Sequence, residues 1–205
     1  MKFLQAIFFL FAFDAVAQTE LGIGLASVKF NNETVLKFYS DPYDKEPKQT
    51  LEFFNDEMVG TSIKDFEIHE EWLQPEVLAI DYSHLIFRCK SEDRFWVEVV
   101  VNNETGETLW LRKSKTLILS TWEEFLKDMF AISRNSMQEI KMQPLDTAEE
   151  NIYTGEECFQ VKSMRGDWIQ IFSAEHCEED GGKLKSGWIK WKEGNTLLVD
   201  YFLTS

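Results

Sequence analysis

The feature that most constrains the fold of this chain is an internal repeat. The segment 87–99 returns 72 positions later as 159–171. Both segments begin with Phe-x-x-Lys-Ser and continue, five residues later, with a tryptophan followed by alternating aliphatic residues. A second tryptophan follows in each copy, at Trp110 and Trp188. Self-similarity of this kind predicts two copies of one small β unit on a single polypeptide.

Strand signals dominate the rest of the chain, because runs rich in β-branched and aromatic residues alternate with turn-forming residues. The predicted strands are 35–39, 85–89, 96–101, 116–119, 168–172 and 197–202. One helix is predicted over 121–131: Thr121 and Glu124 form a capping box, and the apolar residues that follow repeat at helical spacing. We therefore expect a mainly β chain with one amphipathic helix near the junction of the two units.

The two copies differ in length before the repeated segment. In the first copy 45 residues separate Pro42 from Phe87, whereas 15 separate Pro144 from Phe159. The first copy thus carries about 30 extra residues, which we place at about 50–82. Long connections of this kind are often functional. This insertion, the loop 173–186 and the surface between the units are where the copies differ, and a specific function is expected there.

The pattern around the tryptophans resembles the bacterial SH3-like (SH3b) domain: a polar turn, Trp-aliphatic-x-aliphatic, a loop and Gly-Trp-aliphatic. Residues 166–171 and 186–189 follow it well, and 94–99 with 109–111 resemble a divergent member that lacks the glycine before the second tryptophan. The resemblance implies two tandem SH3-like small β-barrels, with unit boundaries at 18–133 and 134–205. It also implies a wall-associated or accessory role, without the proline-rich ligands of eukaryotic SH3 domains.

The N-terminus has the features of a secretory signal peptide over 1–17. Lys2 is followed by an apolar run to Phe13, and Ala15-Val16-Ala17 forms a cleavage site. A membrane anchor is the alternative, but the run is shorter than the roughly 20 apolar residues that span a bilayer. The signal is similar to those common in Bacteroidetes, so we expect an exported protein, periplasmic or extracellular, without a transmembrane segment.

The charge limits the partners. With 36 acidic and 21 basic side chains the net charge is −15, and removal of the signal leaves it unchanged. Nucleic acid is excluded as an expected partner because phosphate binding requires clustered Lys and Arg. A peptide, a glycan or an envelope protein remains as the partner class, and the sequence does not indicate the oligomeric state.

The repeat also sorts the three cysteines. Cys89 aligns with Val161 and is expected to be a buried apolar residue. Cys158 and Cys177 are left as a candidate disulfide, which an oxidising compartment would permit if their Cα atoms lie within about 7 Å.

Trp96 and Trp168 are the candidate ligand-binding residues, since an indole offers a flat apolar face and one N–H donor. The opposing interpretation is that residues shared by both copies serve the fold. An open groove lined by these tryptophans would favour the binding interpretation.

Catalytic and metal signatures are weak. His69-Glu70-Glu71 begins like a zinc-protease helix, but Leu73 stands where the second histidine is needed. The run 175–180 mixes histidine, cysteine and carboxylates, which is more typical of a solvated acidic loop than of a metal site. We predict no catalytic residues, no metal and no cofactor. The leading hypothesis is an exported, non-catalytic binding or accessory module of the cell envelope; the alternative is a small hydrolase with a carboxylate- or cysteine-based site.

Overall fold

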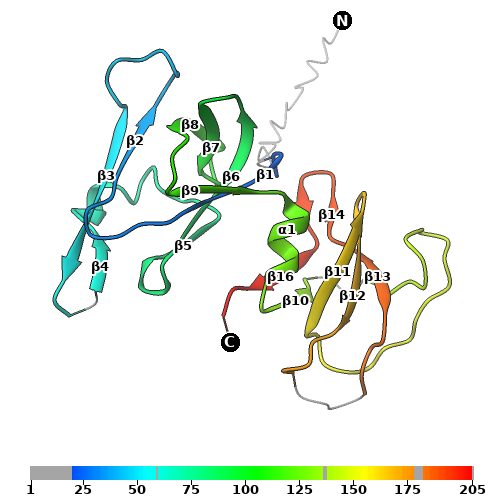
Figure 1. The fold of residues 1–205 in the computed structure, drawn as a ribbon. Coiled ribbons are helices and arrows are strands. Elements are labelled where there is room, and N and C mark those ends of the chain that lie inside the picture. Colours follow the sequence, from blue (N-terminus) through cyan, green and yellow to red (C-terminus); the bar gives the residue numbers. More distant parts are fainter. Residues whose placement is uncertain (1–19, 59, 136–137, 178–181, 205) are drawn as a thin grey trace, which may run out of the picture.

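The computed structural model describes residues 20–204 except 59, 136–137 and 178–181. The predicted signal peptide at 1–17 lies outside the described residues, as do Glu178, Glu179 and Asp180. The prediction of a mainly β chain is confirmed, and two antiparallel sheets follow one another along the sequence (Figure 1).

The first sheet has nine strands, in the order β4-β3-β2-β8-β7-β6-β1-β9, with β5 paired to β6. Their bounds are β1 Gly24–Val28, β2 Val35–Tyr39, β3 Gln49–Asp56, β4 Gly60–Ile63, β5 Val77–Ala79, β6 His84–Glu92, β7 Trp96–Asn102, β8 Glu107–Arg112 and β9 Leu117–Ser120. Two short 3-10 helices, η1 (Phe66–Ile68) and η2 (Ile80–Tyr82), lie before and after β5.

The second sheet has five strands, in the order β13-β12-β11-β10-β16. Their bounds are β10 Ala131–Arg134, β11 Phe159–Arg165, β12 Trp168–Ser173, β13 Gly187–Lys190 and β16 Val199–Phe202. A small hairpin of β14 (Lys192–Glu193) and β15 (Thr196–Leu197) precedes β16. The order matches the β8-β7-β6-β1-β9 part of the first sheet strand for strand, so the repeat extends to topology.

The repeated hairpins also share their register. Cys89 pairs with Val99 in the first copy, and Val161 pairs with Ile171 in the second. In both copies the register shifts two residues further on, between Cys89 and Ser91 and between Val161 and Ser163. A β-bulge therefore bends each hairpin at the same position.

The same side-chain contact crosses each bulge. The Ser91 hydroxyl donates to Glu98 over 2.8 Å, and the Ser163 hydroxyl donates to Gln170 over 3.1 Å. The two copies thus keep a polar contact on the outer face of the sheet while their inward residues stay apolar.

Several strands were not predicted from the sequence, and β1 and β10 matter most for how the sheets are built. Gly24–Val28 was not predicted as a strand, yet β1 pairs with both β6 and β9 near the middle of the first sheet. A Cβ atom on Gly24 would overlap the Ser120 carbonyl oxygen, so glycine is required where β1 and β9 approach closely. The second sheet begins at Ala131, before the predicted unit boundary at 134.

Helix α1 (Trp122–Lys127) begins as predicted but is shorter. The Thr121 side chain accepts from the Glu124 N–H, and the Glu124 side chain accepts from the Thr121 N–H, which completes the capping box. The predicted end at 131 is wrong, because Ala131 pairs with Phe202 and the ladder of β10 and β16 continues to Arg134. This long-range pairing overrides the local helical pattern.

Each sheet covers a core, and the second core reaches across the junction. One cluster of buried apolar side chains belongs to the first sheet. The other combines the second sheet and α1 with Leu21, Leu25 and Ile86 from the first. The Trp122 ring lies 5.6 Å from that of Trp191. The two sheets therefore share apolar packing.

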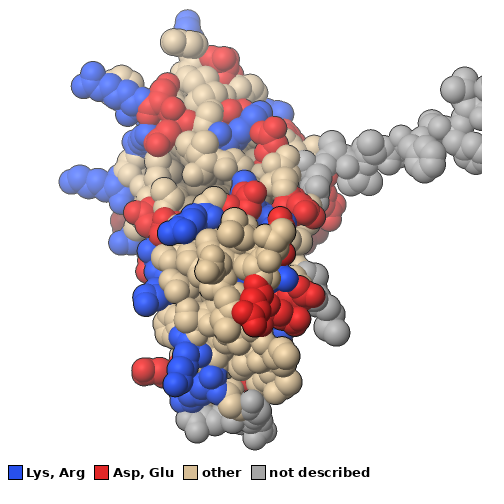
Figure 2. Space-filling model, turned by 90° about the vertical axis from the view of Figure 1, so that its right-hand side faces the viewer, with Lys and Arg blue, Asp and Glu red and all other residues tan. Residues whose placement is uncertain are grey.

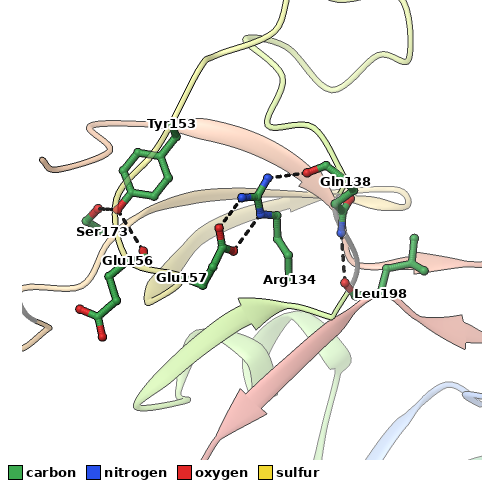
Figure 3. A network of polar contacts seen from close by, with 7 residues as sticks. All are labelled: Arg134, Gln138, Tyr153, Glu156, Glu157, Ser173 and Leu198. Atoms are coloured by element: carbon green, nitrogen blue, oxygen red, sulfur yellow. Dashed lines mark hydrogen bonds and ion pairs between the residues drawn. The ribbon is translucent and has the colours of Figure 1, made fainter. Parts of the chain in front are cut away.

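In the second unit, polar contacts hold the connection between β10 and β11 close to the sheet (Figure 3). The Arg134 guanidinium pairs with both carboxylate oxygens of Glu157 and donates to the Gln138 carbonyl. The hydrogen bond to Glu157 raises the pKa of Arg134, although burial opposes that shift. The Gln138 side chain in turn donates to the Leu198 carbonyl over 3.0 Å, and Tyr153 shares a hydrogen bond with Ser173.

Candidate functional site

The insertion of the first unit forms its own arm of the first sheet. Tyr39 of β2 pairs with Trp110, just as Lys141 bridges to Trp188 in the second unit, so the connections begin alike. The first unit then adds β3, β4 and β5 before its repeated hairpin (Figure 1), with η1 before β5 and η2 after it. The extra residues thus extend the sheet at the β4 edge.

A pocket of about 400 Å³ lies within this insertion. It is lined by Thr61, Ser62, Ile63, Phe66, Leu78, Ile80 and Asp81, which we call the insertion pocket. Four of the seven are apolar, and two hydroxyls and one carboxylate supply polar groups. This size and mixture are typical of sites for small molecules or for single side chains of a larger ligand.

The insertion pocket reaches the edge of β4. Thr61, Ser62 and Ile63 are consecutive residues of that strand, and neighbouring side chains of a strand point to opposite faces. A cavity that touches all three must therefore include the strand edge. The pocket lies between this edge and the hairpin of β5 and β6, with η2 as the nearest element.

Two backbone positions that are close in sequence to the residues of the insertion pocket are unusual. Asp65, just before η1, has φ 50°, and Ser83, just after η2, has φ 61°. They are the two non-glycine residues with positive φ in the described part of the chain. Such conformations gather at functional sites, where the surrounding structure holds them in place.

His69 and Trp72 form a buried, hydrogen-bonded pair within the insertion. The Trp72 indole N–H donates to His69 Nδ1 over 3.2 Å, and the Trp72 ring packs edge-on against Phe38 at 5.3 Å. Burial lowers the pKa of His69, which the nearby Asp65 carboxylate partly opposes. The neutral imidazole accepts this hydrogen bond. Leu73 is buried as well, so this segment is structural and does not form a zinc-protease helix.

The insertion concentrates the negative charge of the protein. Residues 50–82 contain nine Asp or Glu and one Lys, a net charge of −8 out of −15. In contrast, the face in Figure 2, which is the right-hand side of Figure 1, carries basic and acidic side chains interspersed with uncharged surface. Asp81 is the one charged side chain among the described residues that line the insertion pocket, and with the net charge of the segment it favours a cationic over an anionic ligand.

The predicted ligand-binding tryptophans lie elsewhere. Trp96 and Trp168 are both half-buried at the same position of the two repeated hairpins. The Tyr39 ring packs edge-on against Trp96 at 5.3 Å, and the Lys190 ammonium lies 5.5 Å from the centre of the Trp168 ring. Neither lines the insertion pocket. Their contacts within the chain occupy part of the indole surface that a ligand would need.

The cysteines offer no thiolate near neutral pH. Cys89 is buried, and burial raises the pKa of its thiol to about 12, helped by the nearby Glu92 carboxylate. Cys158 and Cys177 are joined in a disulfide with Cα atoms 6.2 Å apart. A cysteine-based hydrolase would need a thiol of low pKa. The carboxylate form of the hydrolase hypothesis stays a prediction.

His176 lies beside that disulfide, within 4.8 Å of both sulfur atoms. The disulfide uses both sulfurs, which leaves a single imidazole from this group as a metal ligand. The His176 ring packs against Phe130 at 3.7 Å between centroids. This contact gives His176 a packing role.

Sequence reasoning located the insertion but not its pocket residues. Two sequence signals point to the segment that contains these residues: the difference in connection length between the copies and the excess of acidic residues. Neither signal identifies Ile63, Leu78 or Ile80 individually. These side chains come together only when β4 and η2 become neighbours in space.

The chain matches no family model, no curated protein and no solved structure. Within the described residues, no helix has the length and apolar character needed to cross a membrane.

Proposed function

We propose that this chain is a non-catalytic binding module in which two SH3-like units form a scaffold and the insertion pocket is the ligand site. The scaffold part rests on the common strand order, the common register and the bulge at the same place in both copies. The role in the cell envelope, and export to the periplasm or beyond, rest on the N-terminal sequence pattern.

One observation carries the site assignment: the insertion pocket is built wholly from residues that the second unit lacks. Features shared by two repeats serve their common fold, whereas a feature present in one copy is free to serve a specific function. Apolar walls with a few polar groups would bind an apolar group and orient it. Trp96 and Trp168 provide a second candidate contact surface, favoured only by their partial exposure.

Titration with Nile red, a neutral apolar fluorescent dye, tests the pocket assignment. We expect the dye to gain fluorescence with the protein, and Leu78→Arg to abolish the gain because the longer charged side chain fills the apolar space. Ile118→Arg is the matched control, since Ile118 is 41% exposed on β9 and lies outside the pocket. An equal loss in both variants, or in neither, would contradict the assignment.

A further inference from the structure

We propose that the insertion pocket and the free edge of β4 together bind an extended, basic polypeptide segment by strand addition. This inference rests on the proposed function, because it uses the same pocket. It goes further by specifying the ligand: a segment that hydrogen bonds to β4, places one apolar side chain in the pocket and carries Lys or Arg on either side.

The register of β4 leaves backbone groups available. The Lys64 N–H donates to the Glu52 carbonyl of β3 over 2.9 Å. Bonded and non-bonded residue pairs alternate along an antiparallel ladder, so the pair of Phe53 and Ile63 is non-bonded. The N–H and C=O groups of Thr61 and Ile63 therefore point away from β3, toward the edge that the pocket reaches.

The edge of β4 is short, at four residues, but it lacks two of the usual protections against pairing. Native edge strands commonly carry charges, proline or a bulge. β4 reads Gly-Thr-Ser-Ile and contains neither a charge nor a proline. Although η2 is its neighbour, no backbone hydrogen bond joins the two in the described part of the chain. An added strand would satisfy the outward groups of Thr61 and Ile63.

The insertion pocket suits the side chain of a paired strand. Side chains of a strand alternate between faces, so one residue of an added segment faces the inner side of β4, where Ile63 is buried against Phe53. Phe66 and Leu78 are partly buried against the same core and line the pocket with Ile63. An aliphatic side chain placed there would continue the core.

The negative charge of the insertion favours a basic ligand at this site. Asp81 lines the insertion pocket, Asp65 lies next to Phe66, and residues 50–82 have a net charge of −8. A second copy of this chain would bring another insertion of the same charge to the edge, which repulsion disfavours. A basic segment is attracted instead.

Synthetic peptides test the proposal. The probe is the heptapeptide Lys-Val-Lys-Leu-Lys-Val-Lys, with Glu-Val-Glu-Leu-Glu-Val-Glu as the charge control, measured by calorimetry. Two further versions carry N-methyl groups on alternate backbone amides, in the two complementary frames. We expect the basic peptide to bind, the acidic one not to, and one N-methylated frame to lose about tenfold or more in affinity, since roughly 1.4 kcal/mol corresponds to tenfold. The other frame should bind nearly unchanged.

Protein variants test whether the charge at the insertion pocket contributes to peptide binding. Asp81→Asn should weaken the basic peptide severalfold and reduce the salt dependence of its binding, whereas Asp200→Asn, an exposed carboxylate on β16, should not. Equal effects of the two N-methylated frames would overturn strand addition. Nile red binding without peptide binding would overturn this inference and leave the proposed function intact. A dimer that forms through β4 and excludes the peptide would also overturn it.

Discussion

At the scale of single residues, two buried side chains of the insertion make polar contacts on which stability depends. One is His69, whose Nδ1 accepts from Trp72, and the other is Glu76, whose carboxylate is 6% exposed. Buried ionisable groups persist where they have partners, so breaking either contact is costly. Both residues belong to the insertion.

Acidification should weaken the protein through His69. Because its pKa is lowered in the folded state, the unfolded state binds more protons, so the free energy of unfolding falls as the pH drops below about 6.5. In His69→Asn a side-chain oxygen can still accept from Trp72, but nothing titrates. We expect urea titrations between pH 8 and 5 to show a steeper decline for the wild type. Parallel declines would contradict this role.

Tyr201→Phe should destabilise the protein by about 1–3 kcal/mol, the usual cost of removing a hydrogen-bond partner from a buried group. The Tyr201 hydroxyl donates to Glu76 over 2.5 Å, while Arg88 binds the other carboxylate oxygen at 2.5 Å. Burial raises the pKa of Tyr201, as does the neighbouring Glu76 carboxylate, so the hydroxyl stays protonated. Tyr153→Phe, which removes a hydroxyl paired only with neutral groups, is the control and should cost less in urea unfolding.

At the scale of elements, β1 shows what close approach demands. Gly24→Ala should cost more free energy of unfolding than Gly106→Ala. A methyl group at Gly24 meets the Ser120 carbonyl oxygen, whereas at Gly106 it meets open space and adds only the strain of φ 75°, about 1–2 kcal/mol. Thermal unfolding of both variants measures the difference. A Gly106 variant that melts lower than the Gly24 variant would argue against this packing.

Local signals explain which elements the sequence reveals. The hairpins β6–β7 and β11–β12 are rich in aliphatic and aromatic residues, so their strands and register can be recognised from the repeat. β1 was missed because Gly24, Ala26 and Ser27 have low strand propensity and are held there by β6 and β9. For the insertion pocket, the sequence indicates the segment that contains it but not the lining residues, because β4 and η2 are brought together by the curl of the sheet.

At the scale of the whole molecule, the two sheets should unfold together. Leu25 and Ile86 of the first sheet belong to the same core as Phe159 and Ile169 of the second, and Glu76 and Tyr201 join the sheets by a hydrogen bond. Urea unfolding followed by tryptophan fluorescence and by far-ultraviolet circular dichroism should give coincident transitions. Two separate transitions would show that the shared core is too weak to couple the units.

The bulge that occurs at the same place in both copies affects how the chain reaches its fold. If β12 pairs with β6 in place of β11, the bulge still fits and the apolar residues still face inward. Misassembly between units is a characteristic failure of repeat proteins, and the shared register and bulge make β6 and β11 alike as pairing partners of β12. The short turns that join each strand to its own neighbour must make the distinction. The repeat thus gives the chain an alternative strand pairing, and the short connection within each hairpin favours the native pairing over it.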